Sequence, residues 1–299
     1  MGWELSLIKA LQAIANPFLD ALFMALGELG GDVIWLMVIF AFLALGRRRE
    51  GLGLAFLVLT GFYTSYSLKY AIGRPRPPVG LQRYGGPRTD PSMPSTHATE
   101  AASNLGFLAS RAKNKKAYLA CSILALLAGL SRVYFGLHWP TDVLAGLALG
   151  LALLAFYASL IEGLLRPRLM ALWARRYRLV PLAILTGVLL ALITPSYWGR
   201  PPTYIGGLVA GLFSGSLLAR AGKKDHRDLV NIFKTVLSCS VGLAGLAISY
   251  ALLSGPAQFL GAMLTGLWAS WIGPRVLWRP DVDGQRRSVG SHSPLIRAR

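Results

Sequence analysis

Long apolar segments alternate with short polar or basic stretches along almost the whole chain. Each apolar segment is close to the roughly 20 residues that an α-helix needs to cross the hydrocarbon core of a bilayer. The pattern therefore predicts membrane-spanning helices at about residues 32–46, 51–73, 95–112, 117–134, 141–165, 179–194, 203–221, 232–253 and 256–274.

Residues 3–27 are also apolar at helical spacing, but polar side chains such as Glu4 and Asp20 interrupt them, and Pro17 would bend or divide a helix there. The sequence leaves open whether this segment spans the bilayer or lies in its interface. With it included, we expect an all-α, polytopic membrane bundle in three parts. These are a core of six helices over residues 1–165, about four further transmembrane helices over 166–280, and a basic, disordered tail over 281–299.

The composition supports a membrane protein, since 54% of the residues are hydrophobic and only 15% are charged. Lys and Arg outnumber Asp and Glu by 31 to 13, a balance that also occurs in nucleic-acid-binding proteins. Here the cations lie mostly in short loops between apolar segments, as in membrane proteins that follow the positive-inside rule. We therefore expect the lipid bilayer, and no nucleic acid, as the partner of this surface.

Three basic loops, at residues 47–49, 113–116 and 166–178, fall on one side of the membrane if each core segment crosses once. Basic short loops mark the cytoplasmic side. Three polar runs, at residues 69–77, 94–97 and 131–142, then fall on the opposite side. The pattern predicts an integral protein, with a bacterial inner membrane as the expected location, whose polar runs face the extracytoplasmic compartment.

The polar runs contain the groups that a phosphoester hydrolase needs in order to bind phosphate. Lys69, Arg76 and Arg132 supply positive charge, and an arginine fork matches phosphate oxygens. Ser95 and the backbone amide of Thr96 would lie at the start of the helix predicted at residues 95–112. Helix N-termini bind anions through their free N–H groups and the helix dipole.

The same runs contain candidates for the chemical steps. His138 and Asp142 are four residues apart and would share one face of a helical turn. A carboxylate bonded to one ring nitrogen would fix the tautomer and leave the other nitrogen of His138 free to attack phosphorus. His97 then remains to donate a proton to the departing oxygen. Cys121 and Cys239 are expected to be buried thiols, from which neither a disulfide framework nor a metal site can be built. We expect no cofactor.

Taken in order, the runs read K-x6-R-P through Lys69 and Arg76, P-S-x-H through His97, and S-R-x5-H-x3-D through His138 and Asp142. This pattern resembles the type 2 phosphatidic acid phosphatase and haloperoxidase superfamily. The resemblance covers roughly residues 1–165. It implies a helical bundle, a phosphohistidine intermediate on His138 and catalysis without a metal. It also implies that His97 acts first as general acid and then as general base.

Many members of that superfamily have Gly where this chain has Thr96. The surrounding residues are similar to the sphingosine-1-phosphate phosphatase branch, which also carries extra C-terminal spans. The resemblance implies hydrolysis of a sphingoid-base or glycerolipid phosphate. A phosphatase for a polyprenyl diphosphate such as undecaprenyl diphosphate is the first alternative, and a lipid transporter or flippase is the second.

Two further features have two interpretations each. Arg74 is either a fourth phosphate ligand or a cation that pairs with lipid headgroups.

Residues 204–213 and 259–268 both begin and end with an aromatic residue and contain glycines at matching positions. They form either an internal repeat or, as we favour, two helices whose small residues allow close packing.

Overall fold

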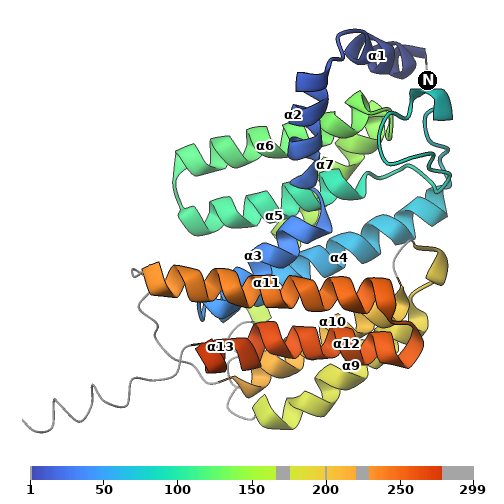
Figure 1. Ribbon diagram of the computed structural model, residues 1–299. Coiled ribbons are helices and arrows are strands. Elements are labelled where there is room, and N and C mark those ends of the chain that lie inside the picture. Colours follow the sequence, from blue (N-terminus) through green and yellow to red (C-terminus); the bar gives the residue numbers. More distant parts are fainter. Residues whose placement is uncertain (1, 166–175, 199–200, 220–228, 278–299) are drawn as a thin grey trace, which may run out of the picture.

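The computed structural model describes residues 2–165, 176–198, 201–219 and 229–277 (Figure 1). Within these ranges the chain forms helices and contains no strand, so the predicted all-α class is confirmed. The predicted basic loop around residues 166–175, the basic residues 223–227 and the tail at 281–299 lie outside the described residues. The boundaries proposed for the three parts therefore stay predictions.

The N-terminal segment forms α1 (Gly2–Ala13) and α2 (Pro17–Glu28), and α3 (Asp32–Ala44) follows after a short break. The Asn16 side chain caps α2 by accepting a hydrogen bond from the Leu19 backbone N–H at 3.0 Å, and Pro17 occupies the first turn. The predicted helix at residues 32–46 is shorter than a span. Together α2 and α3 are long and apolar enough for one span, but they are bent by 48° at the break, the geometry of a broken span or a re-entrant loop.

The N-terminal half continues with α4 (Arg48–Ile72), α5 (Thr96–Ala112), α6 (Lys115–Tyr134) and α7 (Pro140–Phe156), which η2 (Tyr157–Leu165) prolongs. The long α4–α5 connection contains the short η1 (Val79–Leu81). By length and composition α4, α6 and the segment Pro140–Gly163 are long and apolar enough to cross a membrane. The helix predicted at 95–112 is α5, but it is more polar than a span and is enclosed by α4, α6 and α7.

The C-terminal half contains a further set of helices, which lie below α3 and α4 in Figure 1. Of these, α11 qualifies as a span, whereas α9 and α10 are shorter apolar helices. The elements are η3 (Arg176–Leu179), α9 (Val180–Ile193), η4 (Ser196–Trp198), α10 (Pro202–Leu218), α11 (Leu229–Leu252), α12 (Gly255–Leu267), η5 (Trp268–Ile272) and α13 (Gly273–Leu277).

One hydrophobic cluster joins the two halves, because Ile39 of α3 and Leu54 of α4 share it with Leu212 of α10. Within the C-terminal half, α10 and α12 pack directly against each other. A Cβ atom added to Gly207 would collide with the carbonyl oxygen of Phe259, and one added to Gly211 with that of Met263. The glycines shared by residues 204–213 and 259–268 therefore serve close helix packing, the interpretation favoured from the sequence.

The basic end of the bundle is held together by Glu162. Its carboxylate pairs with Arg111 near the end of α5 and with Arg49 at the start of α4, the latter at 3.2 Å. Because α4, α5, α6 and α7 alternate in direction, the C-terminus of α4, the N-terminus of α5, the C-terminus of α6 and the N-terminus of α7 all lie at the other end. That end contains the three polar runs.

Candidate active site

The ends of four helices meet at one point and bring the three polar runs together. Lys69 is in the last turn of α4, Ser95 directly precedes α5, Arg132 is in the last turn of α6, and Asp142 is in the first turn of α7. The backbone N–H of Ser95 donates to the carbonyl oxygen of Asp142 at 2.9 Å. The second and third runs are thereby joined directly.

His138 lies in the turn between α6 and α7, and only 4% of it is exposed. The turn is held by the Arg132 carbonyl, which accepts from the backbone N–H groups of Leu137 at 2.9 Å and His138 at 3.3 Å. Nε2 of His138 lies 3.1 Å from Nη1 of Arg76. An arginine can only donate, so Nε2 carries its lone pair and the ring proton is on Nδ1, the nitrogen that faces Asp142.

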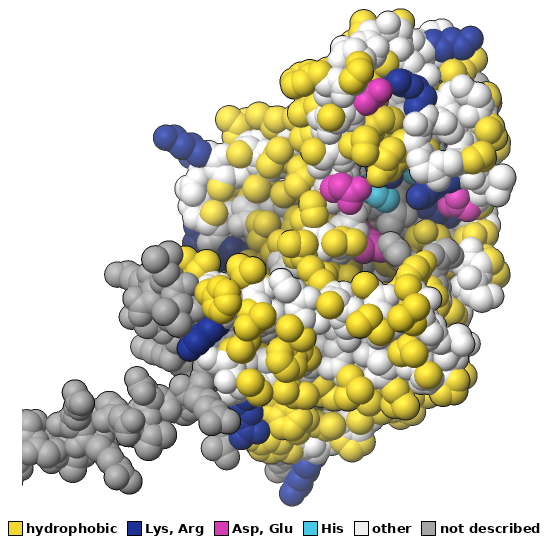
Figure 2. All heavy atoms as spheres, in the orientation of Figure 1, with side chains coloured by type: hydrophobic (Ala, Val, Ile, Leu, Met, Phe, Trp, Pro, Cys, Tyr) yellow, Lys and Arg dark blue, Asp and Glu magenta, His cyan; other side chains and the backbone are white. Residues whose placement is uncertain are grey.

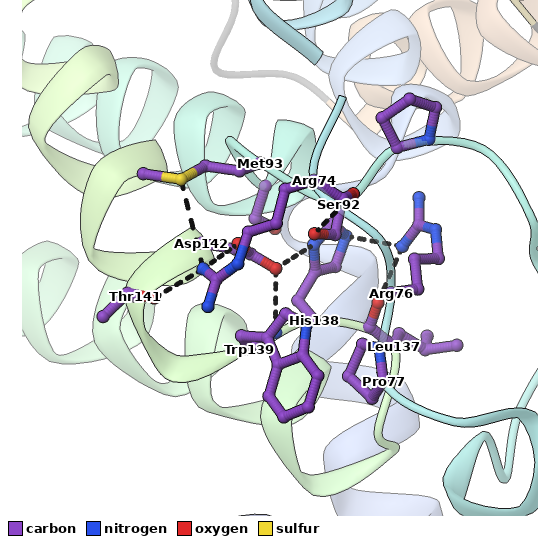
Figure 3. A network of polar contacts seen from close by, with 12 residues as sticks. Arg74, Arg76, Pro77, Ser92, Met93, Leu137, His138, Trp139, Thr141 and Asp142 are labelled. Carbon is purple, nitrogen blue, oxygen red and sulfur yellow. Dashed lines mark hydrogen bonds and ion pairs between the residues drawn. The ribbon is translucent and has the colours of Figure 1, made fainter. Parts of the chain in front are cut away.

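Asp142 is more firmly bonded to other groups than to His138 (Figure 3). Its Oδ2 accepts from the backbone N–H of Trp139 at 2.8 Å, and its Oδ1 accepts from Nη1 of Arg74 at 2.6 Å. Nδ1 of His138 lies 3.6 Å from Oδ2, which is beyond hydrogen-bond range. The two residues also do not share a helical face, because the helix cap is Trp139 and His138 precedes it.

Arg76 is buried, with 4% of its side chain exposed, and it contacts three groups. Nη1 donates to the Leu137 carbonyl at 2.7 Å as well as to His138, and Nε and Nη2 form a two-pronged pair with the Asp90 carboxylate at 3.2 and 2.8 Å. Burial alone would raise the pKa of Asp90, but its hydrogen bonds with Arg76 and the charges of Arg76 and Lys69 lower it overall. Asp90 therefore stays ionised and fixes the guanidinium.

Lys69 is 2% exposed and anchors the loop that leads into α5. Its Nζ donates to the carbonyl oxygens of Ser92 at 2.8 Å and Pro91 at 3.1 Å. Ser92 in turn donates from its backbone N–H to the Arg74 carbonyl at 2.8 Å. Since an ammonium group has three protons, these two bonds leave one donor for a further acceptor.

His97 and Arg132 form the opposite wall of the site. Nη2 of Arg132 lies 3.1 Å from Nε2 of His97, so this Nε2 also carries a lone pair in the present arrangement. The break between α2 and α3 packs against both residues. A Cβ atom on Gly30 would collide with the backbone of His97, and one on Gly27 would lie 3.0 Å from Nη1 of Arg132.

Four buried polar atoms of the site have no hydrogen-bond partner among the described residues. They are Oγ of Ser95, Oγ1 of Thr96, Nε of Arg132 and Nδ1 of His138. Buried polar atoms in folded proteins nearly always have partners, and the Ser95 hydroxyl does not cap α5. Hydroxyl and guanidinium donors of this kind fit the oxygens of a bound phosphoryl group.

Burial lowers the pKa of His138 well below its usual range, and the positive charges of Lys69, Arg76 and Arg132 lower it further. The imidazole is therefore neutral near pH 7. A neutral imidazole with its lone pair on Nε2 is the form in which histidine acts as a nucleophile.

Comparison with known proteins finds relatives of this chain. The family model described as "PAP2 superfamily" matches residues 50–166. The undecaprenyl-diphosphatase of Sulfolobus acidocaldarius is 30% identical over half of this chain and 74% of its own length. Phosphatidylglycerophosphatase B of Bacillus subtilis is 32% identical over 48% of this chain and 76% of its own length.

This chain belongs to the PAP2 superfamily.

Two further proteins are similar to this chain. The dihydrosphingosine 1-phosphate phosphatase C823.11 of Schizosaccharomyces pombe is 30% identical over half of this chain and 40% of its own length. A solved structure of a transmembrane PAP2 type phosphatidylglycerolphosphate phosphatase from Bacillus subtilis covers 55% of this chain and 86% of its own, with 28% identity and a TM-score of 0.48.

Membership of the PAP2 superfamily confirms the superfamily and the enzyme class expected from the three runs, a phosphatase that acts on lipid phosphates. The helices long and apolar enough to cross a membrane fit an integral membrane protein.

Sequence reasoning missed two acidic residues of this PAP2 site, Asp90, which fixes Arg76, and Glu4, which holds Arg74. Nη2 of Arg74 pairs with Oε2 of Glu4 at 2.8 Å, and Oε1 of Glu4 accepts from the Thr141 hydroxyl at 2.6 Å. Burial raises the pKa of Glu4, but the hydrogen bonds from Thr141 and the charge of Arg74 lower it overall. Glu4 belongs to α1, outside the matched segment, and nothing in its sequence neighbourhood indicates this contact.

Arg74 is thus paired with two carboxylates, a role that neither interpretation from the sequence included. Its guanidinium also lies over the ring of Trp139, 5.7 Å from the centroid. Trp139 is buried and its Nε1 donates to the Pro75 carbonyl at 2.9 Å. The residues between the motif positions therefore form a rigid support behind His138.

The PAP2 site opens at the surface. Figure 2 shows a hollow on one face with a histidine side chain at its floor and Lys, Arg, Asp and Glu side chains around it. Hydrophobic side chains cover much of the same face, in the upper and the lower part of the molecule. The hollow therefore gives a polar site an entrance in a largely apolar surface.

Proposed function

We propose that this PAP2 protein hydrolyses the phosphomonoester of a membrane lipid, either a sphingoid-base or a glycerolipid phosphate, through a phosphohistidine on His138. The observation that carries the proposal is the position of Arg76. Its Nη1 lies 3.1 Å from Nε2 of His138, the nitrogen that carries the lone pair. A phosphate held by this arginine would therefore have its phosphorus next to the attacking nitrogen.

In the first step, Nε2 of His138 attacks phosphorus and the bond between phosphorus and the lipid oxygen breaks. His97, protonated on Nε2 once the phosphate oxygens engage Arg132, gives its proton to the departing lipid oxygen. In the second step, His97 takes a proton from water, whose oxygen attacks the phosphorus. The bond between phosphorus and nitrogen breaks, and inorganic phosphate and the free His138 are released.

The charge of the phosphoryl group would be balanced by side chains. Lys69, Arg76 and Arg132 are all buried beside His138, and each has an N–H group directed at the carbonyls or histidines that border the site. Ser95 and the amide of Thr96 would add hydrogen bonds at the start of α5. We propose that this set replaces a metal ion in stabilising the transition state.

Asp142 and the groups around it would orient His138. Closing the 3.6 Å separation between Oδ2 and Nδ1 to a hydrogen bond requires a small movement of the ring, and such contacts often tighten when a substrate binds. Arg74 and Glu4 would hold Asp142 in place during this step. They are positioning residues and do not touch the phosphate.

The site would face the extracytoplasmic side. The end of the bundle opposite the site contains the basic residues 47–49 and 113–116, which favours a cytoplasmic location for that end. The lipid headgroup would then enter from the outer leaflet.

The choice of lipid is supported by two considerations. Thr96 keeps the backbone amide at the start of α5 and adds a buried hydroxyl to the site that a glycine would lack. The similarity to the Schizosaccharomyces pombe dihydrosphingosine 1-phosphate phosphatase is in line with a sphingoid-base phosphate.

A polyprenyl diphosphate is the second candidate, because the Sulfolobus acidocaldarius protein with 30% identity is an undecaprenyl-diphosphatase. A diphosphate needs a cation beyond the first phosphate. Arg88 is exposed in the outer loop, and its charge acts on both Asp90 and Arg132. It is the residue we would assign to a second phosphate.

One assay panel tests these proposals. Purified protein in detergent is given sphinganine 1-phosphate, phosphatidate, phosphatidylglycerol phosphate and undecaprenyl diphosphate, with and without EDTA, and released phosphate is measured. We expect faster hydrolysis of a monophosphate and no effect of EDTA. Loss of activity with EDTA would overturn the metal-free mechanism, and a preference for the diphosphate that Arg88→Gln abolishes would favour the second candidate.

A further inference from the structure

A cavity of about 90 Å³ lies between the PAP2 core and the C-terminal half. Its wall is formed by α3, α4, α5 and α10, with apolar side chains such as Leu36, Phe62 and Leu212. The lining residues that carry charge are Asp32 and Glu100. No part of the proposed chemistry uses this cavity.

The charged end of the cavity adjoins the active site. Glu100 follows His97 by three residues on α5, about 4.5 Å along the helix axis. Asp32 begins α3 directly after the break in which Gly30 packs against the backbone of His97. The cavity therefore begins within about one helical turn of the proton donor.

From this end the cavity extends along α10 toward the basic end of the bundle. The start of α10 is near the site, because Tyr70 in the outer half of α4 donates to the carbonyl of Tyr197 at 3.0 Å. The end of α10 is near the basic loops, because Arg48 donates to the carbonyl of Ala219 at 2.7 Å. The lining residues of α10 run from 204 to 213, about 13 Å of helix.

We propose that this cavity binds an alkyl chain of the lipid phosphate substrate, and that α10 determines which chains fit. The proposal rests on the proposed function, since the phosphate must lie at His97 and His138 for the chain to enter at the charged end. Apart from the two carboxylates at one end, the lining of the cavity is apolar, and a hydrocarbon chain gains free energy by leaving water and filling such a space. The C-terminal half would thus determine which lipid alkyl chains the PAP2 core accepts.

Two substitutions of one residue test the proposal in opposite directions. Leu212 is 4% exposed and lies in the deeper half of the cavity. Leu212→Trp should fill the cavity and lower the ratio of kcat/KM for dioleoyl phosphatidate to that for dihexanoyl phosphatidate by about tenfold. Leu212→Ala should enlarge it and raise the ratio of kcat/KM for branched diphytanoyl phosphatidate to that for the dioleoyl lipid several-fold. The matched control is Leu189→Trp on α9, which is 49% exposed and outside the cavity, and should leave both ratios unchanged.

A binding measurement separates this proposal from the proposed function. A lipid phosphate with a diazirine at the end of its chain is photoactivated on the purified protein and on its His138→Ala variant, and labelled peptides are identified. We expect label on residues 204–213 in both proteins and less label after Leu212→Trp. Label confined to lipid-facing residues of α9, or chain ratios that Leu212 substitutions do not change, would overturn the proposal. Label on α10 without phosphate release from any lipid would instead overturn the proposed function and leave the chain site standing.

Discussion

Nη1 of Arg76 lies 3.1 Å from Nε2 of His138, and the other nitrogens of the same guanidinium group are bonded to Asp90. The carboxylate therefore fixes the plane of the arginine that faces the proposed nucleophile. A planar, two-pronged pair of this kind depends on the guanidinium group, which lysine does not reproduce.

We predict that Arg76→Ala lowers kcat/KM for the preferred lipid phosphate about 100- to 1,000-fold, the effect of removing one donor to the transition state. Arg76→Lys should restore little of this loss, because a lysine cannot pair with Asp90 and the phosphate together. Arg83→Lys is the matched control, since Arg83 is one-third exposed and pairs with Asp20 outside the site. Equal activity of Arg76→Lys and the unmodified protein would contradict the assigned role.

The contact between Arg74 and Asp142 leads to a second prediction. Arg74→Ala removes the donor to Oδ1 of Asp142, so we expect kcat to fall about 10- to 100-fold with little change in KM. Arg74→Lys should recover part of kcat, and Glu4→Gln should give a smaller loss. A rise in KM at constant kcat would show instead that Arg74 binds the substrate.

The lowered pKa of His138 predicts how phosphorylation depends on pH. An exposed histidine becomes protonated below about pH 6.5, whereas the buried His138 stays neutral to lower pH. The rate of His138 phosphorylation, measured in single turnovers, should therefore not fall with a midpoint near pH 6.5 as the pH is lowered from 7. A decline with a midpoint near 6.5 would contradict the neutral nucleophile.

The same shift affects stability. Below about pH 6.5 the unfolded chain binds a proton on His138 that the folded chain does not bind, so the free energy of unfolding should fall as pH decreases. His138→Asn should reduce this dependence. The comparison uses thermal unfolding in one detergent across the pH range.

The close contact of Gly30 with His97 gives a further prediction. Gly30→Ala places a Cβ atom against the His97 backbone, and we expect a loss of about 1–3 kcal/mol in the free energy of unfolding together with lower kcat. Gly80→Ala is the control, because a Cβ atom there has no neighbour within 4 Å. Similar effects of the two substitutions would show that the break between α2 and α3 does not position His97.

How far the sequence predicted the site can be judged from individual residues. Lys69, His97 and Asp142 were assigned to one site from motif spacing, and the helix ends bring them together because α4, α5 and α7 alternate in direction. Glu4 and Asp90 were not found. Their partners are 70 and 14 residues away, and a carboxylate that pairs with a distant arginine leaves no local pattern.

In the fold, too, some features were predictable from the sequence and others were not. The lengths of α4, α6 and α11 followed from continuous apolar segments. Nothing in the sequence indicates that α2 and α3 form one bent pair, because Gly30 in the break packs against His97 of α5, which is far away along the chain. The polar residues of α5 were included in a span because they lie between apolar ones, and only the packing of neighbouring helices shows that they are enclosed.

The most direct test of the account is the identity of the residue that becomes phosphorylated. The protein is mixed with a radiolabelled lipid phosphate, quenched within one turnover at alkaline pH, digested and analysed by mass spectrometry. We predict an acid-labile phosphoryl group on His138, no label in His138→Ala, and label that persists longer in His97→Ala because the second step then lacks its base. Phosphate release by His138→Ala at the full rate, or a label on any other residue, would contradict the proposed mechanism.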